Sequence, residues 1–118
     1  MNFNDFWILY LKAHKNPMTR FMHYIATVIG ILGGIVSLWT LSLHWVIFAI
    51  LIGIVLAILS HLIIENNKPL FLINPFYGAL SDLRMFYLFL GRRLKNEYLK
   101  HNIEYSPKNS SKNKPIIL

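Results

Sequence analysis

The fold is decided by residues 21–64, FMHYIATVIGILGGIVSLWTLSLHWVIFAILIGIVLAILSHLII, a stretch without any Asp, Glu, Lys or Arg. A helix of ~20 residues crosses the ~30 Å hydrocarbon core of a bilayer. The uncharged stretch is therefore too long for one crossing and about right for two. We predict two helices that cross a membrane, turn and return.

Composition supports an integral membrane protein with a single domain. Of the 118 residues, 55% are hydrophobic and 14% are charged, whereas about 25% are charged in soluble domains. The net charge of +7 comes from basic residues that flank the uncharged stretch, which favours a membrane surface over a nucleic acid as partner. The chain has no cysteine, which excludes disulfides and thiolate metal sites.

The two predicted spans cover residues 18–41 and 45–64, with the turn at Ser42-Leu43-His44. The turn has no Lys or Arg, whereas basic residues lie before and after the hairpin, so the positive-inside rule predicts that both termini are cytoplasmic. The membrane would be the inner membrane of a bacterium or the endoplasmic reticulum of a eukaryote. Glycines at 30, 33, 34 and 53 allow close helix packing, either within the hairpin or between two copies in a homodimer.

The rest of the chain completes an all-α architecture. Residues 3–14 carry an aromatic stripe at helical spacing, which predicts an amphipathic helix lying on the membrane interface. Residues 70–80 are apolar but too few to span, which predicts a re-entrant or interfacial loop. Ser81 then caps a C-terminal amphipathic helix that begins at Asp82. We expect one membrane-embedded domain over residues 1–105 and a disordered basic tail over 106–118.

Counting outward from the turn brings two histidines to one depth. His23 lies 20 residues before Leu43 and His61 lies 18 residues after it, which predicts that they face each other at the cytoplasmic boundary. His14 folds back towards the same point across the break at Pro17. Glu65, one turn beyond His61, and Asp82 are the nearest candidate carboxylates.

A cluster of histidines with a carboxylate suits Fe, Zn, Mn or Ni. The alternative is a set of separate interface histidines that bind no metal. Arg20, on nearly the same face as His23, either holds a substrate carboxylate or lipid phosphate, or anchors the helix end at the headgroups.

The same residues carry a resemblance to a known family. The first block is Phe6-Trp7, Tyr10-Leu11, His14, Pro17, Arg20 and His23; the second is Ser60-His61, Glu65-Asn66, Pro69, Pro75, Ser81-Asp82, Met85-Phe86 and Gly91. Together, over about residues 3–95, they resemble a small membrane family whose fungal members are 2-hydroxy-fatty-acid dioxygenases of phytosphingosine breakdown.

The resemblance implies an Fe(II)-dependent dioxygenase that takes O₂ and a 2-hydroxy fatty acid and releases an acid one carbon shorter, without 2-oxoglutarate. It implies that His14, His23 and His61 are catalytic metal ligands, and it leaves Glu65 and Asp82 as alternatives for a further ligand. We assign substrate binding to Arg20, Lys68 and Asn66, and expect membrane lipids around the protein. The alternatives are a zinc-dependent lipid hydrolase with Glu65 as base, a bis-histidine haem protein, and a non-catalytic membrane scaffold or adaptor.

Overall fold

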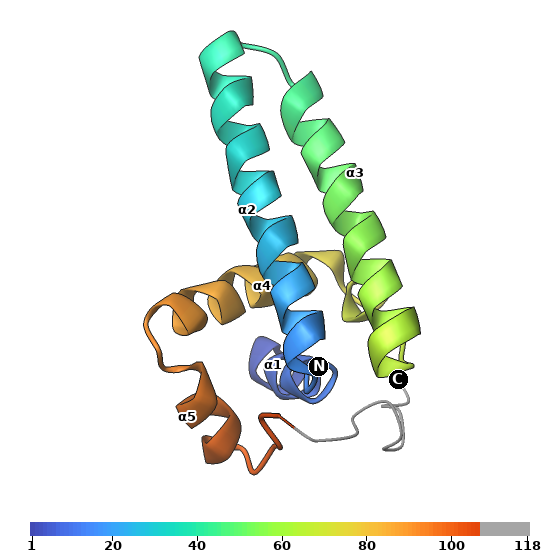
Figure 1. Ribbon diagram of the computed structural model, residues 1–118, viewed down its shortest axis with the longest axis vertical. Coiled ribbons are helices and arrows are strands. Elements are labelled where there is room, and N and C mark those ends of the chain that lie inside the picture. The colour runs from blue at the N-terminus through green and yellow to red at the C-terminus, as the bar shows by residue number, and fades with distance from the viewer. Residues whose placement is uncertain (107–118) are drawn as a thin grey trace.

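The computed structural model describes residues 1–106, which form helices and no strand. Two long helices, α2 (Pro17–Thr40) and α3 (His44–Leu59), form an antiparallel hairpin. The shorter helices gather at the open end of this hairpin (Figure 1). Of the tail predicted over residues 106–118, residues 107–118 lie outside the described part, and the single-domain boundary at 105 stays a prediction.

The hairpin confirms the two predicted long helices. Pro17–Thr40 and His44–Glu65 are each long and apolar enough to cross a membrane. Leu41, in the left-handed conformation with φ of 54°, ends α2. Ser37 Oγ accepts a hydrogen bond from the Val46 amide at 2.8 Å, which ties the two helices together at the turn.

One glycine allows the close approach of α2 and α3. A Cβ added to Gly33 would lie 2.5 Å from Ala49 Cβ and 2.9 Å from the Trp45 carbonyl oxygen. A Cβ added to Gly30 or Gly34 would have no neighbouring atom within 4 Å. Packing within one hairpin therefore explains Gly33, whereas the homodimer stays a prediction.

The aromatic face of α1 (Phe3–Lys12) is covered by protein. Phe6, Trp7, Tyr10 and Leu11 are buried, and Phe6 packs edge-on against Tyr77. Our prediction of a helix that lays this face on a membrane is wrong, because the stripe forms the core beneath the hairpin. Helical periodicity alone does not say whether lipid or protein covers an apolar face.

The apolar segment 70–80 is not one loop, and the last long helix does not begin at Asp82. A short 3₁₀-helix, η2 (Leu70–Leu72), is followed by α4 (Pro75–Leu90). Asn74 caps α4 by accepting a hydrogen bond from the Tyr77 amide at 3.0 Å, and Pro75 occupies the first turn. Ser81 and Asp82 therefore lie in the middle of α4, where Ser81 is buried and Asp82 faces His23, and Ser81 is not a helix cap.

Two further elements were not predicted. Residues Ser60–Glu65 continue α3 as a π-helix, η1, so that the last turn of the second span is widened. A short helix, α5 (Leu94–Lys100), follows α4 and buries Leu94 and Tyr98 against the core.

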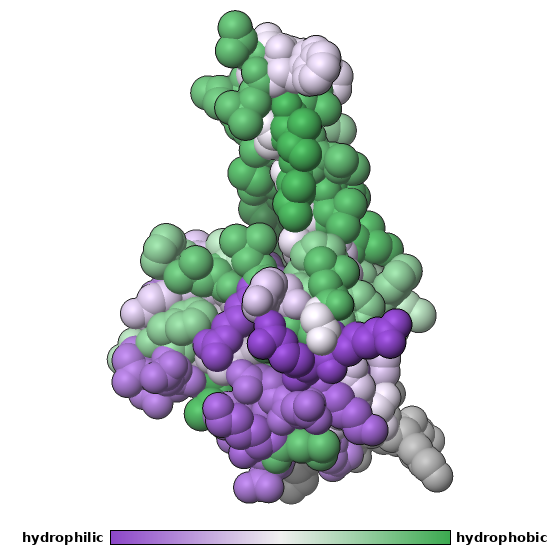
Figure 2. Space-filling model, turned by 90° about the vertical axis from the view of Figure 1, so that its left-hand side faces the viewer, coloured by the Kyte–Doolittle hydropathy of each residue, from purple (hydrophilic) through white to green (hydrophobic). Residues whose placement is uncertain are grey.

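The surface divides along the length of the molecule. Figure 2 shows apolar side chains along the hairpin and hydrophilic side chains gathered at the opposite end. The surface of the hairpin therefore suits a hydrocarbon environment, and the end that carries the shorter helices suits water.

Candidate metal centre

Three imidazole rings meet where the shorter helices join the hairpin. His14 Nε2 lies 3.2 Å from His23 Nε2 and 3.0 Å from His61 Nε2. One ligand atom from each ring lies within 4.8 Å of the others, and the residues are only 1%, 4% and 1% exposed. The predicted convergence of His14, His23 and His61 is therefore present in the structure.

Each histidine arrives from a different element. His14 follows the end of α1, and its amide donates to the Leu11 carbonyl at 3.1 Å. His23 lies in the second turn of α2, whose start is fixed by Asn16 as the capping residue and Pro17. His61 lies in η1, where the second span ends.

The outer nitrogen of every ring faces an oxygen acceptor. His14 Nδ1 lies 2.6 Å from the Tyr10 carbonyl oxygen, and His61 Nδ1 lies 2.6 Å from Asn67 Oδ1. His23 Nδ1 lies 3.2 Å from Asp82 Oδ1. These oxygens accept, so each Nδ1 donates a proton to its partner, and Nε2 is the atom of each ring that can offer a lone pair towards the other two.

The Asn67 amide is oriented by a second contact. Its Nδ2 donates to the Ala13 carbonyl at 3.3 Å, which leaves Oδ1 to face His61. The Ala13 carbonyl, next to His14, therefore orients the Asn67 amide, and this amide in turn sets the tautomer of His61. The positions of His14 and His61 are thus linked through Asn67.

Three lone pairs facing one another at this distance repel unless a cation lies among them. A second proton on a ring would relieve the repulsion, but burial lowers the pKa of His14 well below its usual range, and the nearby His23 and His61 lower it further. A metal ion fits this donor set, since neutral imidazoles with fixed outer hydrogen bonds are typical metal ligands. Imidazole donors suit Fe, Zn, Cu and Ni, so the cluster could hold a metal ion, and its geometry selects none of these.

Asp82 supports the cluster from behind His23. The hydroxyl of Tyr10 donates to the same carboxylate oxygen that faces His23 Nδ1. Burial raises the pKa of Tyr10 well above its usual range, and the charge of Asp82 raises it further, so Tyr10 stays a donor. The ring of Tyr10 also stacks on His14 at 4.0 Å between centroids. Of our two candidate carboxylates, Asp82 is the one that contacts a clustered histidine.

Glu65 is directed elsewhere. Its Oε1 accepts a hydrogen bond from the Asn16 amide at 2.7 Å, which joins the end of η1 to the start of α2. The expectation that Glu65 shares a face with His61 assumed α-helical geometry. In a π-helix the hydrogen bonds connect residues five apart, so the faces are rotated.

The predicted substrate residues lie in three different settings. Arg20 is buried, donates from Nη1 to the carbonyls of His14 and Lys15 at 2.9 Å each, and stacks over Tyr105 at 4.2 Å. Asn66, with φ of 57°, ends η1 in the left-handed conformation. Lys68 is exposed, next to Pro69, which lines the space beside the histidines. These placements do not test substrate binding, but they favour Lys68 over Arg20 for contact with a ligand.

Sequence reasoning missed three supporting residues. Tyr98 on α5 donates from its hydroxyl to the His14 carbonyl at 2.6 Å, the same oxygen that Arg20 contacts. No local sequence pattern reveals these contacts. Tyr98 lies far from His14 in the sequence, and Asn67 lies beyond the end of the helix that carries His61. Tyr10 was detectable, since it lies four residues before His14 on one helix face.

The space beside the histidines is small. It has a volume of about 10 Å³, close to the room that one water molecule needs. Within residues 1–106 its lining is Tyr10, His14, His23, His61, Pro69, Leu70, Phe71, Gly78 and Asp82. The space accommodates an ion or a water molecule but no organic substrate unless part of the lining moves.

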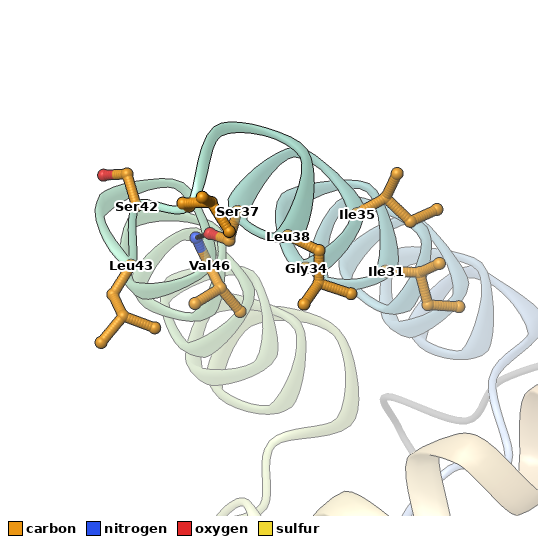
Figure 3. A pocket seen from close by; sticks show the side chains of 9 residues that line it. Ile31, Gly34, Ile35, Ser37, Leu38, Ser42, Leu43 and Val46 are labelled. Carbon is orange, nitrogen blue, oxygen red and sulfur yellow. Dashed lines mark hydrogen bonds between the residues drawn. The ribbon is translucent and has the colours of Figure 1, made fainter.

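A larger apolar groove lies at the other end of the molecule. Figure 3 shows Ile31, Ile35 and Leu38 of α2 on one side of it and Leu43 and Val46 on the other. This groove lies beside the hairpin turn, and neither a charged side chain nor a histidine is among its lining residues. It therefore lacks the chemistry of the histidine cluster.

One comparison with known protein families matches most of the chain. A family model described as "2-hydroxy-palmitic acid dioxygenase Mpo1-like" matches residues 1–94, which include the three histidines, Asn67 and Asp82. No curated protein and no solved structure shows significant similarity to the chain. The matched region ends at Leu94, where α5 begins.

Proposed function

The chain belongs to the Mpo1-like family of 2-hydroxy-palmitic acid dioxygenases, and we propose that it is an Fe(II)-dependent dioxygenase that shortens a 2-hydroxy fatty acid by one carbon. The family name and the buried histidine triad support this proposal. The reaction balances as R–CH(OH)–COOH + O₂ → R–COOH + CO₂ + H₂O. The electrons lost by the two substrate carbons are those that one O₂ takes up, so a second reductant such as 2-oxoglutarate is not needed.

His14, His23 and His61 would hold the iron through Nε2. When bound, iron supplies the redox chemistry that lets O₂ react with an organic acid. Three protein ligands leave positions open for other groups, as in oxygenases that use two histidines and a carboxylate. Asp82 would orient His23 instead of binding the iron, and Glu65 would join the end of η1 to the start of α2.

The remaining polar groups bind and orient. Lys68, exposed next to the lining residue Pro69, offsets the charge of the substrate carboxylate. Tyr10 and Asp82 keep the proton of His23 on Nδ1, and Asn67 does the same for His61. Arg20 acts through His14, because its guanidinium is occupied by backbone carbonyls and tyrosine rings.

The proposed setting is the cytoplasmic boundary of a membrane. Two helices are long and apolar enough to span, and the basic residues of the chain flank them. In this setting both termini are cytoplasmic and the histidines lie at headgroup depth. A long-chain acid that partitions into the bilayer would keep its carboxylate and hydroxyl at the same level.

The convergence of three Nε2 atoms carries the proposal, and metal analysis tests it. We expect detergent-purified protein to bind one iron, the His23→Ala and His61→Ala variants to lose it, and His44→Ala, at the hairpin turn, to keep it. The wild type should consume O₂ with 2-hydroxyhexadecanoic acid and release pentadecanoic acid, as measured by mass spectrometry.

The same experiment separates the alternatives. Stoichiometric zinc with hydrolysis of a lipid ester would indicate a hydrolase, although Glu65 is not placed to serve as its base. A Soret band would indicate haem. Protein without stoichiometric metal would indicate a scaffold and would overturn the proposal.

A further inference from the structure

One short segment lines the histidine site next to α4. Pro69, Leu70 and Phe71 line the small space from one side, and Gly78 of α4 lines it behind them. A Cβ on Gly78 would lie 3.0 Å from Phe71 Cβ and 3.2 Å from Phe71 Cα, so the segment packs directly on the α4 backbone.

The residues that continue this segment are apolar and exposed. Leu72, Ile73 and Phe76 follow immediately, and they are 63%, 53% and 67% exposed. Large apolar side chains grouped in this way mark a binding surface or a membrane contact. The segment therefore runs from buried residues that line the histidine site to exposed apolar residues beside it.

The position of this segment suits contact with lipid. In Figure 1 the segment that carries η2 rises from the lower end of the hairpin to the level at which α4 crosses α2. Leu62 and Ile63, at the end of the second span, are exposed as well. The uncovered apolar side chains thus lie at the same end of the span as the histidine site.

The other sides of the site are closed by buried structure. Tyr10 stacks on His14, Asn67 is tied to Ala13, and Tyr98 and Arg20 contact the His14 carbonyl. Opening any of these sides would break hydrogen bonds that orient the ligands. Displacing residues 69–72 would instead separate mainly apolar contacts.

We propose that residues 69–76, which we call the entry segment, admit the substrate from the membrane side and bind its apolar chain on Leu72, Ile73 and Phe76. This inference rests on the proposed function and specifies how a long-chain 2-hydroxy acid is recognised. The head of the acid enters beside Lys68 when Phe71 withdraws from Gly78, and the chain stays outside. The substrate class is an amphiphile with a long unbranched chain and a 2-hydroxycarboxylate head.

Chain length is the readout that this surface controls. Each methylene removed from water contributes about fourfold in affinity. An acid that covers Leu72 and Phe76 should bind more tightly than one whose chain is too short to reach them. A site that recognises only the head would bind the long and the short acid with equal affinity, once their different partitioning into the bilayer is taken into account.

A double variant tests the surface in protein reconstituted in lipid nanodiscs. For Leu72→Ser/Phe76→Ser, the KM for 2-hydroxyhexadecanoic acid should rise about tenfold and that for 2-hydroxyoctanoic acid less than about twofold. Leu83→Ser/Leu90→Ser, which changes exposed apolar residues elsewhere on α4, should leave both KM values unchanged. Unchanged metal content shows that each variant is folded at the site.

A photoreactive substrate gives a readout that does not depend on turnover. With 2-hydroxyhexadecanoic acid carrying a terminal diazirine, we expect cross-links within residues 70–77, identified by mass spectrometry. Cross-links confined to other segments, or equal KM changes for both acids, would overturn the entry segment while leaving the dioxygenase intact. If the wild type neither binds nor converts either acid, the proposed function fails and the inference fails with it.

Discussion

His61 and Asn67 contact each other twice across the end of the second long helix. His61 Nδ1 lies 2.6 Å from Asn67 Oδ1, and the Asn67 amide donates to the His61 carbonyl at 3.0 Å. The residue between the helix and Asn67, Asn66, adopts the left-handed conformation that turns the chain back. One helix end therefore places both a candidate metal ligand and the group that orients it.

Replacing Asn67 should weaken metal binding without removing it. In Asn67→Ala the ring of His61 loses its acceptor, and loss of such an outer partner typically costs about 10–100-fold in metal affinity. Titration of the metal-free protein with Co(II), followed by its visible absorption, measures this change. Asn96→Ala, at an exposed position of α5, is the matched control and should bind as the wild type does.

The two candidate carboxylates should behave differently. Asp82→Asn keeps an oxygen that faces His23, so metal should remain bound with affinity lowered by about tenfold. Glu65→Gln should leave metal affinity unchanged and lower stability by about 1–2 kcal/mol, because the part-buried Asn16 amide loses its charged acceptor. Loss of metal in Glu65→Gln, with metal retained in Asp82→Asn, would reverse this assignment.

Tyr98 should stabilise the ligand loop from outside the family-matched region. Tyr98→Phe removes the hydroxyl that donates to the His14 carbonyl and keeps the buried ring. We expect a loss of about 1 kcal/mol in the free energy of unfolding, and weaker Co(II) binding, because His14 is then held by Arg20 alone at this carbonyl. Tyr87→Phe, at an exposed position, should change neither quantity.

Neighbouring glycines of α2 should respond with opposite signs. Gly33→Ala places a methyl group 2.5 Å from Ala49 Cβ, which should destabilise the hairpin by about 1–3 kcal/mol. Gly34→Ala meets nothing within 4 Å and should stabilise the helix by up to about 1 kcal/mol. Thermal unfolding in detergent compares the two variants, and equal shifts would show that the α2–α3 contact is looser than described.

The metal-free protein should lose stability in mild acid. The pKa of His14 is lowered in the folded state, so below about pH 6.5 the unfolded chain takes up a proton that folded His14 does not. Stability then falls as pH falls, by at most about 1.4 kcal/mol per pH unit for this group. His14→Gln should show a shallower pH dependence of the melting temperature, and a slope equal to that of the wild type would contradict the prediction.

The sequence by itself determined the helical hairpin and the nearly equal distance of His23 and His61 from its turn. A long uncharged stretch has few ways to satisfy its backbone in lipid, so two helices and a turn follow from length and composition. Equal arm lengths then bring His23 and His61 to one level. The convergence of His14 with His23 and His61 also followed from the sequence, because His14 is linked to His23 by only a short Pro-broken connection.

Only the tertiary structure decided what surrounds the triad. Whether lipid or protein covers the aromatic face of α1 depends on α4 and α5, which approach from distant parts of the sequence. The widening of the second span into a π-helix directs Glu65 to Asn16, and the early start of α4 at Pro75 brings Asp82 behind His23. Periodicity fixes which residues share a helix face, but contacts between faces depend on packing, and the orientation of each imidazole is set by those contacts.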